Sequence, residues 1–159
     1  MSNVTYNCHG FKFTKTLYIN NILTNCDVLF IQDHWLSSSQ LSQIDHINYP
    51  NFLCHAVSGF DNSEVLSGRP YGGCAILWRS DMVSRVDTIT TNSRRACAIK
   101  MSTDQWTILF ITVHMAYEDG EDQTEDFCMQ LSVIEYVISQ NANCHIIIGG
   151  YFNVDFSRN

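Results

Sequence analysis

The 159 residues are enough for one domain with a sizeable core, and 45% hydrophobic with 16% charged residues excludes a disordered chain. No apolar run reaches the roughly 18–20 residues that a membrane-spanning helix needs, and residues 1–6 have no signal-peptide pattern, so an intracellular location in the cytoplasm or nucleus is expected. The net charge of −7 argues against a generic nucleic-acid binder, because such proteins bind chiefly by neutralising phosphates.

The charge is unevenly distributed along the chain. Residues 65–103 carry six basic and two acidic side chains, so the remainder carries −11. The basic residues are Arg69, Arg79, Arg85, Arg94, Arg95 and Lys100. Such a basic middle fits either one phosphate-facing surface or scattered solubilising charges.

The first half of the chain predicts two strand–helix units. Strands are expected at 4–8 and 28–32, and helices at 11–25 and 37–46, the second helix capped by a serine. A loop that contains Pro50 and Gly59 then leads to a pair of glycines at 72–73.

From Cys74 onward the hydrophobic period changes to that of strands. Strands are expected at 74–78, 86–91, 96–101 and 106–115, followed by a helix at 122–139 and a buried strand in the run from His145 to Ile148. The apolar face of this helix is expected to contain Phe127, Leu131, Ile134 and Val137 or Ile138. Acidic residues crowd its start, where the helix dipole favours them. This order of elements predicts an α/β layered fold with a mixed sheet.

The chain has seven cysteines. No two of them form a Cys-x-x-Cys pair, and several lie inside apolar runs. We therefore predict small, buried, reduced thiols, with a zinc site or a disulfide framework as the alternative.

Polar side chains follow several strands, in a pattern that suits phosphodiester chemistry. They are Asn7, Asp33 with His34, His114 and Asn153. Hydrolysis of a phosphodiester needs charge neutralisation at the phosphate, an activated water and a stabilised leaving oxygen, which oxygen-bound Mg²⁺ and a His or Asp can supply. Taken singly, the two asparagines could build turns, Asp33 could be a cap, and the histidines could be packed side chains.

Taken together, these segments resemble the endonuclease/exonuclease/phosphatase family. The resemblance covers Val4-Thr5-Tyr6-Asn7-Cys8-His9-Gly10, Leu29 to Leu36, Phe110 to Tyr117 and Gly149-Gly150-Tyr151-Phe152-Asn153. Gly68-Arg69-Pro70-Tyr71-Gly72-Gly73 and the strand after it are close to the apurinic-type endonuclease domains of non-LTR retrotransposons. The resemblance implies a layered α/β sandwich and Mg²⁺-dependent hydrolysis of DNA.

The resemblance assigns a role to each matching position. Asp33 stands where the family has the glutamate that is the main Mg²⁺ ligand, and Asn7 stands on the metal-site asparagine. Asn153 matches the catalytic asparagine of the Gly-Gly-Asp-Phe-Asn signature. Arg69 and Tyr71 are implied to face DNA.

The departures from the family pattern predict impaired or lost activity. His114 replaces the catalytic tyrosine, Tyr151 replaces the signature aspartate, and Asp33 is one methylene shorter than glutamate. A Ser-Asp-His segment that follows in the family is not in residues 1–159, which we expect to form one incomplete, C-terminally truncated domain; Asp155 is the nearest substitute acid. A non-catalytic scaffold that binds nucleic acid or protein is the alternative, as is a piece cut from an active parent. We expect a homodimer or a partner chain to cover a sheet face left open by the truncation.

Overall fold

The computed structural model describes residues 1–47, 50–60, 63, 71–82, 84–116 and 121–153. In this part of the chain, eight strands form two four-stranded sheets, in the orders β1-β2-β4-β3 and β5-β6-β7-β8. The pairs β1–β2 and β7–β8 are parallel, and the other neighbours are antiparallel. The strands are β1 Asn3–Asn7, β2 Val28–Gln32, β3 Phe52–Val57, β4 Cys74–Arg79, β5 Arg85–Ile89, β6 Ala96–Ser102, β7 Thr107–His114 and β8 His145–Tyr151.

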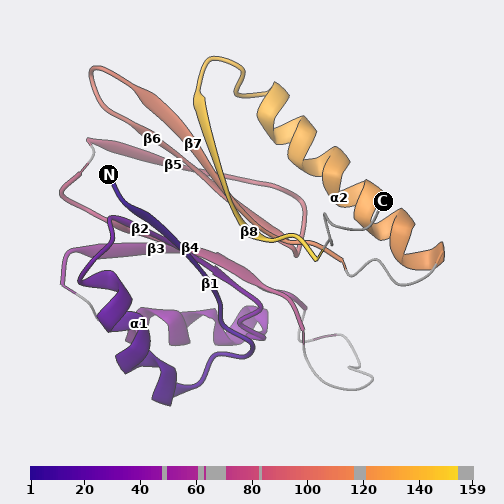
Figure 1. Ribbon diagram of the computed structural model, residues 1–159, viewed down its shortest axis with the longest axis horizontal. Helices are drawn as coiled ribbons and strands as arrows, with labels where there is room; N and C mark the ends of the chain where they lie inside the picture. The colour runs from indigo at the N-terminus through magenta and orange to yellow at the C-terminus, as the bar shows by residue number, and fades with distance from the viewer. Residues whose placement is uncertain (48–49, 61–62, 64–70, 83, 117–120, 154–159) are drawn as a thin grey trace.

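The two sheets lie face to face, and helices cover their outer faces (Figure 1). The helices are α1 Thr16–Leu23, α2 Glu121–Ser139 and the 3-10 helices η1 Phe13–Lys15 and η2 Ser38–His46. Apolar residues of α1, η2 and α2 pack on the adjacent sheet, so the molecule has four layers and the predicted α/β sandwich is confirmed. No helix in the described part of the chain is long and apolar enough to cross a membrane.

The core between the sheets explains the most apolar strands of the sequence. Phe30, Ile76 and Trp78 of the first sheet pack against Ile99 and Phe110 of the second. Strand β2 is buried at every position because it is central in its sheet and covered on both faces, which accounts for its continuous apolar run. Each four-stranded sheet buries the inner face of the other, whereas Ile146 and Ile148 of β8 stay 40% and 38% exposed.

Strand β3 is an element that the sequence analysis placed in a loop. It lies at the edge of its sheet, and most of its residues are half-buried. An edge strand needs no strongly apolar run, and the segment from Phe52 to Val57 includes a cysteine, a histidine and an alanine that weaken the strand pattern.

Helix α1 is shorter than its sequence pattern indicates, and one residue expected on the apolar face of α2 is exposed. Helix α1 begins only at Thr16, and Leu17 is 80% exposed while Ile19 and Leu23 are buried. In α2, Ile134 and Val137 face the sheet as predicted, but Leu131 is 46% exposed. The serine cap predicted for the second helix is Ser37, which forms a capping box with Gln40.

Four of the seven cysteines are buried, as their apolar surroundings predicted, whereas Cys54 and Cys144 are half-buried and Cys128 is exposed. Cys74 and Cys97 are fully buried between the sheets and are free thiols. Burial raises the pKa of Cys8 and of Cys26 to about 11, so both stay protonated at neutral pH.

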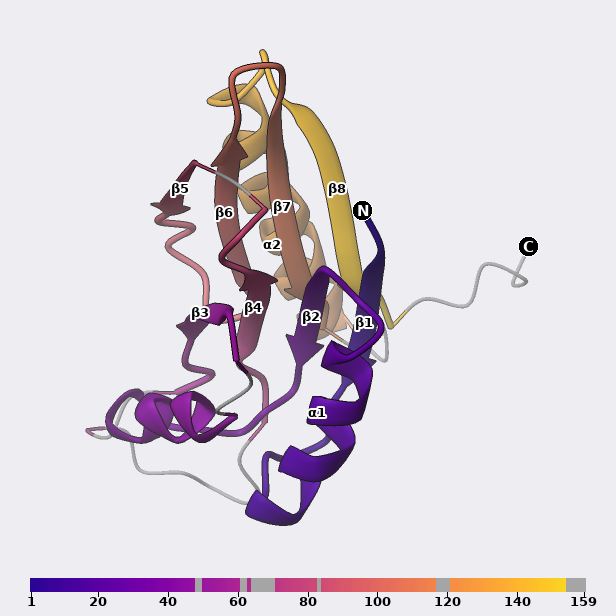
Figure 2. The same cartoon turned by 90° about the vertical axis from the view of Figure 1, so that its left-hand side faces the viewer.

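Several strand ends meet at one end of the sandwich. Gln32 at the end of β2 pairs with Cys74 at the start of β4, and His114 at the end of β7 pairs with Tyr151 at the end of β8. The sheets are joined there by a buried hydrogen bond of 2.8 Å from Gln32 Nε2 to Thr112 Oγ1. In Figure 2, β1 and β8 lie beside each other at one edge of the molecule. This arrangement brings the predicted polar residues to a common end.

Candidate functional site

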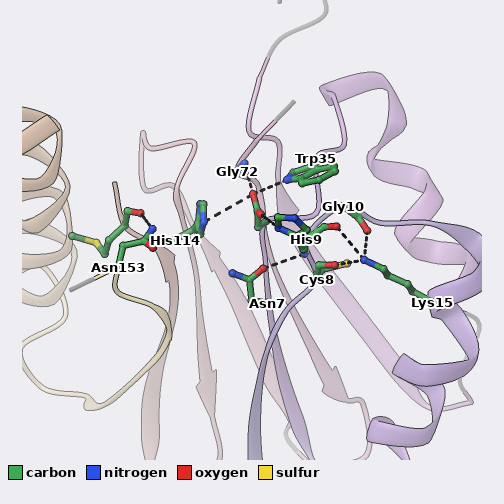
Figure 3. Close-up of polar contacts among 11 residues, drawn as sticks. Asn7, Cys8, His9, Gly10, Lys15, Trp35, Gly72, His114 and Asn153 are labelled. Atoms are coloured by element: carbon green, nitrogen blue, oxygen red, sulfur yellow. Dashed lines mark hydrogen bonds and ion pairs between the residues drawn. The ribbon is translucent and has the colours of Figure 1, made fainter. Parts of the chain in front are cut away.

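The carboxylate of Asp33 follows β2 at these strand ends and is bound by the protein itself. Figure 3 labels Trp35, Gly72, His9 and His114, which surround this carboxylate. Its Oδ1 accepts hydrogen bonds from Trp35 Nε1 and from the backbone N–H of Gly72, each at 2.8 Å. The side chain is 8% exposed. One carboxylate oxygen is therefore already satisfied by two N–H donors.

Two histidines flank the same carboxylate. His9 Nδ1 lies 3.4 Å from Asp33 Oδ2, and His114 Nε2 lies 4.0 Å from Asp33 Oδ1. The His9 side chain is 64% exposed and its ring meets the Trp35 ring edge-on, with centroids 4.9 Å apart. His9 and Trp35 both lie in segments that resemble the family, but unlike His114 neither was predicted as a site residue, because the resemblance assigns roles there only to Asn7 and Asp33.

The loop that carries Asp33 is fixed by backbone hydrogen bonds to the two glycines before β4. The N–H of Asp33 donates to the carbonyl of Gly73 at 2.8 Å, and the N–H of Trp35 donates to the carbonyl of Gly72 at 3.0 Å. Asp33 and Trp35 have φ of 58° and 62°, in the left-handed region that non-glycine residues avoid. These contacts hold two strained residues in place.

His34 locks the loop from the buried side. Its Nδ1 accepts a hydrogen bond from the N–H of Leu36 at 3.1 Å, so its Nε2 carries the proton and donates to the carbonyl of Val57 at 3.2 Å. Burial lowers the pKa of His34 to about 4, so the ring is neutral at physiological pH. His34 therefore supports the site without acting in it.

The loop that carries His9 is held by Lys15. The Lys15 ammonium donates to the carbonyl oxygens of Cys8, of His9 at 3.1 Å and of Gly10 at 2.9 Å. Gly10 has φ of 82°, and a Cβ there would come within 2.3 Å of the Trp35 ring. A glycine is therefore required where this loop meets Trp35.

His114 forms a stacked pair with Tyr151 on the neighbouring strand. The ring centroids are 5.9 Å apart, with planes 19° from parallel. Burial is the main cause that lowers the pKa of His114, while Asp33 raises it and Arg95 lowers it further. His114 Nδ1 is buried and has no hydrogen-bond partner among the described residues.

The two predicted asparagines build turns at strand ends. Asn7 Oδ1 accepts the N–H of His9 at 3.1 Å. Asn153 has φ of 53°, and its Nδ2 donates to the carbonyl of Met115 at 2.7 Å. These are the local roles that the sequence left open as alternatives, and in Figure 3 Asn153 lies beyond His114 from His9.

Of the two residues predicted to face DNA, Tyr71 is the one that the structure describes. It is 57% exposed, and the Arg95 guanidinium lies 5.3 Å from its ring centroid. Both residues line a pocket of about 170 Å³ that Asp126 also borders. Arg69 and Asp155, also proposed from the sequence, lie outside the described residues.

The chain matches the Endonuclease/Exonuclease/phosphatase family over residues 4–155, and it belongs to that family. No curated protein matches it. The sandwich is the fold of this family, as the resemblance implied.

Solved structures share this fold at low identity. A humanized D. rerio TDP2 carrying 14 mutations aligns with a TM-score of 0.66 and 16% identity over 99% of this chain and 68% of that one. The 3′ phosphatase NExo from Neisseria, bound to a product DNA hairpin, aligns at 0.66 and 15% over 95% and 57%. The endonuclease domain of the telomere-specific non-LTR retrotransposon TRAS1 aligns at 0.64 and 14% over 97% and 61%. The chain thus spans between 57% and 68% of these three chains.

Members of this family typically bind Mg²⁺, but the side chains described here do not fit such an ion. No three His, Cys, Asp or Glu residues in the described part of the chain are grouped so that they could hold a metal. Asp33 Oδ1 already accepts two hydrogen bonds, and Oδ2 faces His9. Imidazole nitrogens suit transition metals better than Mg²⁺, which prefers oxygen ligands in octahedral geometry.

The contact between Gly73 and His34 predicts unequal effects of two glycine substitutions. Both glycines have a positive φ, 79° at Gly72 and 85° at Gly73. A Cβ added at Gly73 would lie 2.4 Å from the His34 ring, whereas a Cβ added at Gly72 would have its nearest atom at 3.6 Å. We expect Gly72→Ala to lower the free energy of unfolding by about 1–2 kcal/mol, and Gly73→Ala by about 1–3 kcal/mol more. Urea denaturation measures both, and equal losses would contradict the packing described.

The pKa of His34 predicts a loss of stability in acid. Because the folded-state value of about 4 lies below the ordinary 6.5, the unfolded chain binds a proton that the folded chain excludes. The contribution of neutral His34 to the free energy of unfolding is complete above pH 6.5, and roughly 3 kcal/mol of it is lost as the pH falls to about 4. Urea denaturation across this range should show this slope, and His34→Gln should remove it. An unchanged slope in the variant would show that other groups cause it.

Proposed function

We propose that this end of the sandwich binds a phosphodiester of DNA, and that the Mg²⁺-dependent hydrolysis typical of the family is strongly reduced or lost. The observation that carries the proposal is the state of Asp33, whose Oδ1 is hydrogen-bonded to Trp35 and Gly72. A Mg²⁺ ligand at this position would have to compete with both N–H donors. The same carboxylate is one methylene shorter than the glutamate that it replaces.

The other groups at the site support binding better than catalysis. Removal of one acid–base or charge-stabilising group typically costs about 10²–10⁴-fold in rate. His114 and Tyr151 both depart from the family pattern, and their rings stack on each other. His9, by contrast, is exposed beside Asp33, and Arg95 lies close enough to lower the pKa of His114. These groups can donate to phosphate oxygens.

The proposal includes an origin in a non-LTR retrotransposon and a location in the cytoplasm or nucleus. The segment around Tyr71-Gly72-Gly73 and the structural similarity to the TRAS1 endonuclease domain support the origin. Free cysteines support a reducing compartment. DNA is the proposed ligand because relatives of this fold have been solved with DNA, among them NExo with a hairpin and a D. rerio TDP2 with a single-strand product.

We further propose that a second copy of the chain pairs along β8. This strand ends its sheet in the described part of the chain, and Ile146 and Ile148 are 40% and 38% exposed on it. An exposed edge strand with apolar side chains is a template for pairing with another strand. A different partner chain is the other occupant that this edge suits.

Nicking of plasmid DNA tests the loss of hydrolysis. Wild-type protein is incubated with supercoiled or abasic-site plasmid and Mg²⁺, beside Asp33→Asn, which keeps the shape of the side chain but removes its charge. We expect the two proteins to nick equally little, while wild-type protein still retards labelled DNA at low salt. Mg²⁺-dependent nicking by the wild type that Asp33→Asn abolishes would contradict the proposal.

Sedimentation velocity tests the pairing along β8. We expect a dimer for the wild type, and a monomer for Ile146→Lys because an unpaired ammonium in the interface is costly. Leu53→Lys is the matched control, since Leu53 is 53% exposed on β3 at the edge of the other sheet. A monodisperse wild-type monomer would rule out the homodimer.

A further inference from the structure

Four aromatic or cationic residues at the ends of separate strands are linked in a row across the candidate site. Tyr71 precedes β4, Arg95 precedes β6, and His114 and Tyr151 end β7 and β8. Arg95 lies over the Tyr71 ring, its carbonyl accepts the N–H of His114 at 2.8 Å, and His114 stacks on Tyr151. We name these residues the Tyr71–Tyr151 strip.

The two tyrosines at the ends of the strip are exposed although their rings are held by neighbours. Tyr71 is 57% exposed and Tyr151 is 46% exposed. Each ring has one fixed neighbour, the Arg95 guanidinium for Tyr71 and the His114 ring for Tyr151. A planar ring that is held in place and still exposed is a stacking platform for a nucleobase.

Among the described residues, the charges around the strip are too few for recognition of a duplex backbone. Duplex binding draws its affinity from several cationic side chains that neutralise phosphates. Arg79 ends β4, and Arg85 pairs with Ser102 at the end of β6, so both lie at the opposite ends of their strands from the strip. Asp81 and Asp87 hold them there.

The cations that border the strip are balanced in turn. Arg94 and Arg95 line the pocket beside Tyr71, but Asp126 lines the same pocket and Asp33 lies next to His114. Affinity at this end must therefore come mainly from stacking rather than from charge.

Stacking discriminates between single and double strands. In a duplex, both faces of each base are covered by its neighbours, whereas an unpaired base can leave the stack and lie on an aromatic side chain. Resting on the proposed function, we propose that the Tyr71–Tyr151 strip binds single-stranded nucleic acid. Bases stack on Tyr71 and Tyr151, and Arg95 contacts the phosphate between them.

Fluorescence anisotropy with short labelled oligonucleotides tests this proposal. The probes are a DNA strand, the RNA strand of the same sequence and the DNA duplex. The proteins are the wild type, Tyr71→Ala, Tyr151→Ala, Tyr151→Phe and Tyr136→Ala. Tyr136 is the matched control, because it is a 61% exposed tyrosine on α2. Thermal unfolding checks that each variant is folded.

We expect the wild type to bind one or both single strands at least tenfold more tightly than the duplex. Each of Tyr71→Ala and Tyr151→Ala should weaken that binding about 5-fold to 100-fold, whereas Tyr151→Phe, which keeps the ring, and Tyr136→Ala should not. Which single strand binds better identifies the ligand as DNA or RNA.

Equal affinity for duplex and single strand, or unchanged binding by both alanine variants, would overturn the single-strand proposal while leaving DNA binding intact. Binding of none of the probes by a folded wild type would overturn the proposed function as well.

Discussion

The site depends on the backbone between Asp33 and Trp35, where a fully buried strand ends in two left-handed residues. Such conformations cost about 1–3 kcal/mol each and persist only where surrounding contacts fix them. Here the contacts are the carbonyls of Gly72 and Gly73, the neutral ring of His34 and the bond between the Trp35 indole and the Asp33 carboxylate. The carboxylate is consequently part of the loop's own hydrogen-bond network. A metal ligand must be available to the metal, but this carboxylate already accepts hydrogen bonds from Trp35 and Gly72.

The two largest departures from the family pattern are neighbours in space. His114 and Tyr151 are register partners on β7 and β8, and their rings stack. Considered one at a time along the sequence, each is the loss of a catalytic group. Considered together, they form a packed aromatic pair beside Arg95 that keeps Tyr151 exposed. The same substitutions that we propose to weaken hydrolysis thus supply a surface suited to stacking.

Sequence patterns predicted the layered fold, because continuous apolar runs locate central strands. They also selected Asp33 and His114 as polar residues at strand ends, and the structure places these two residues together. They missed β3, whose edge position requires no apolar run, and they predicted a longer first helix than α1, which begins only at Thr16. They also missed His9, Trp35 and Lys15. The roles of these residues arise from contacts between loops that follow different strands, and no local period encodes such contacts. Asn7 and Asn153 were selected by motif, yet their hydrogen bonds in the structure are those of turns.

The central claim is that Asp33 is held by Trp35 and Gly72 and is not available to Mg²⁺. The indole N–H of Trp35 reports on this bond directly, and its NMR resonance can be assigned by its loss in Trp35→Phe. A titration of the wild type with millimolar Mg²⁺ should leave the position of that resonance unchanged, apart from the effect of an equal ionic strength of NaCl. A saturable shift that is specific to Mg²⁺ and absent in Asp33→Asn would show that the carboxylate binds the ion, and would contradict the account.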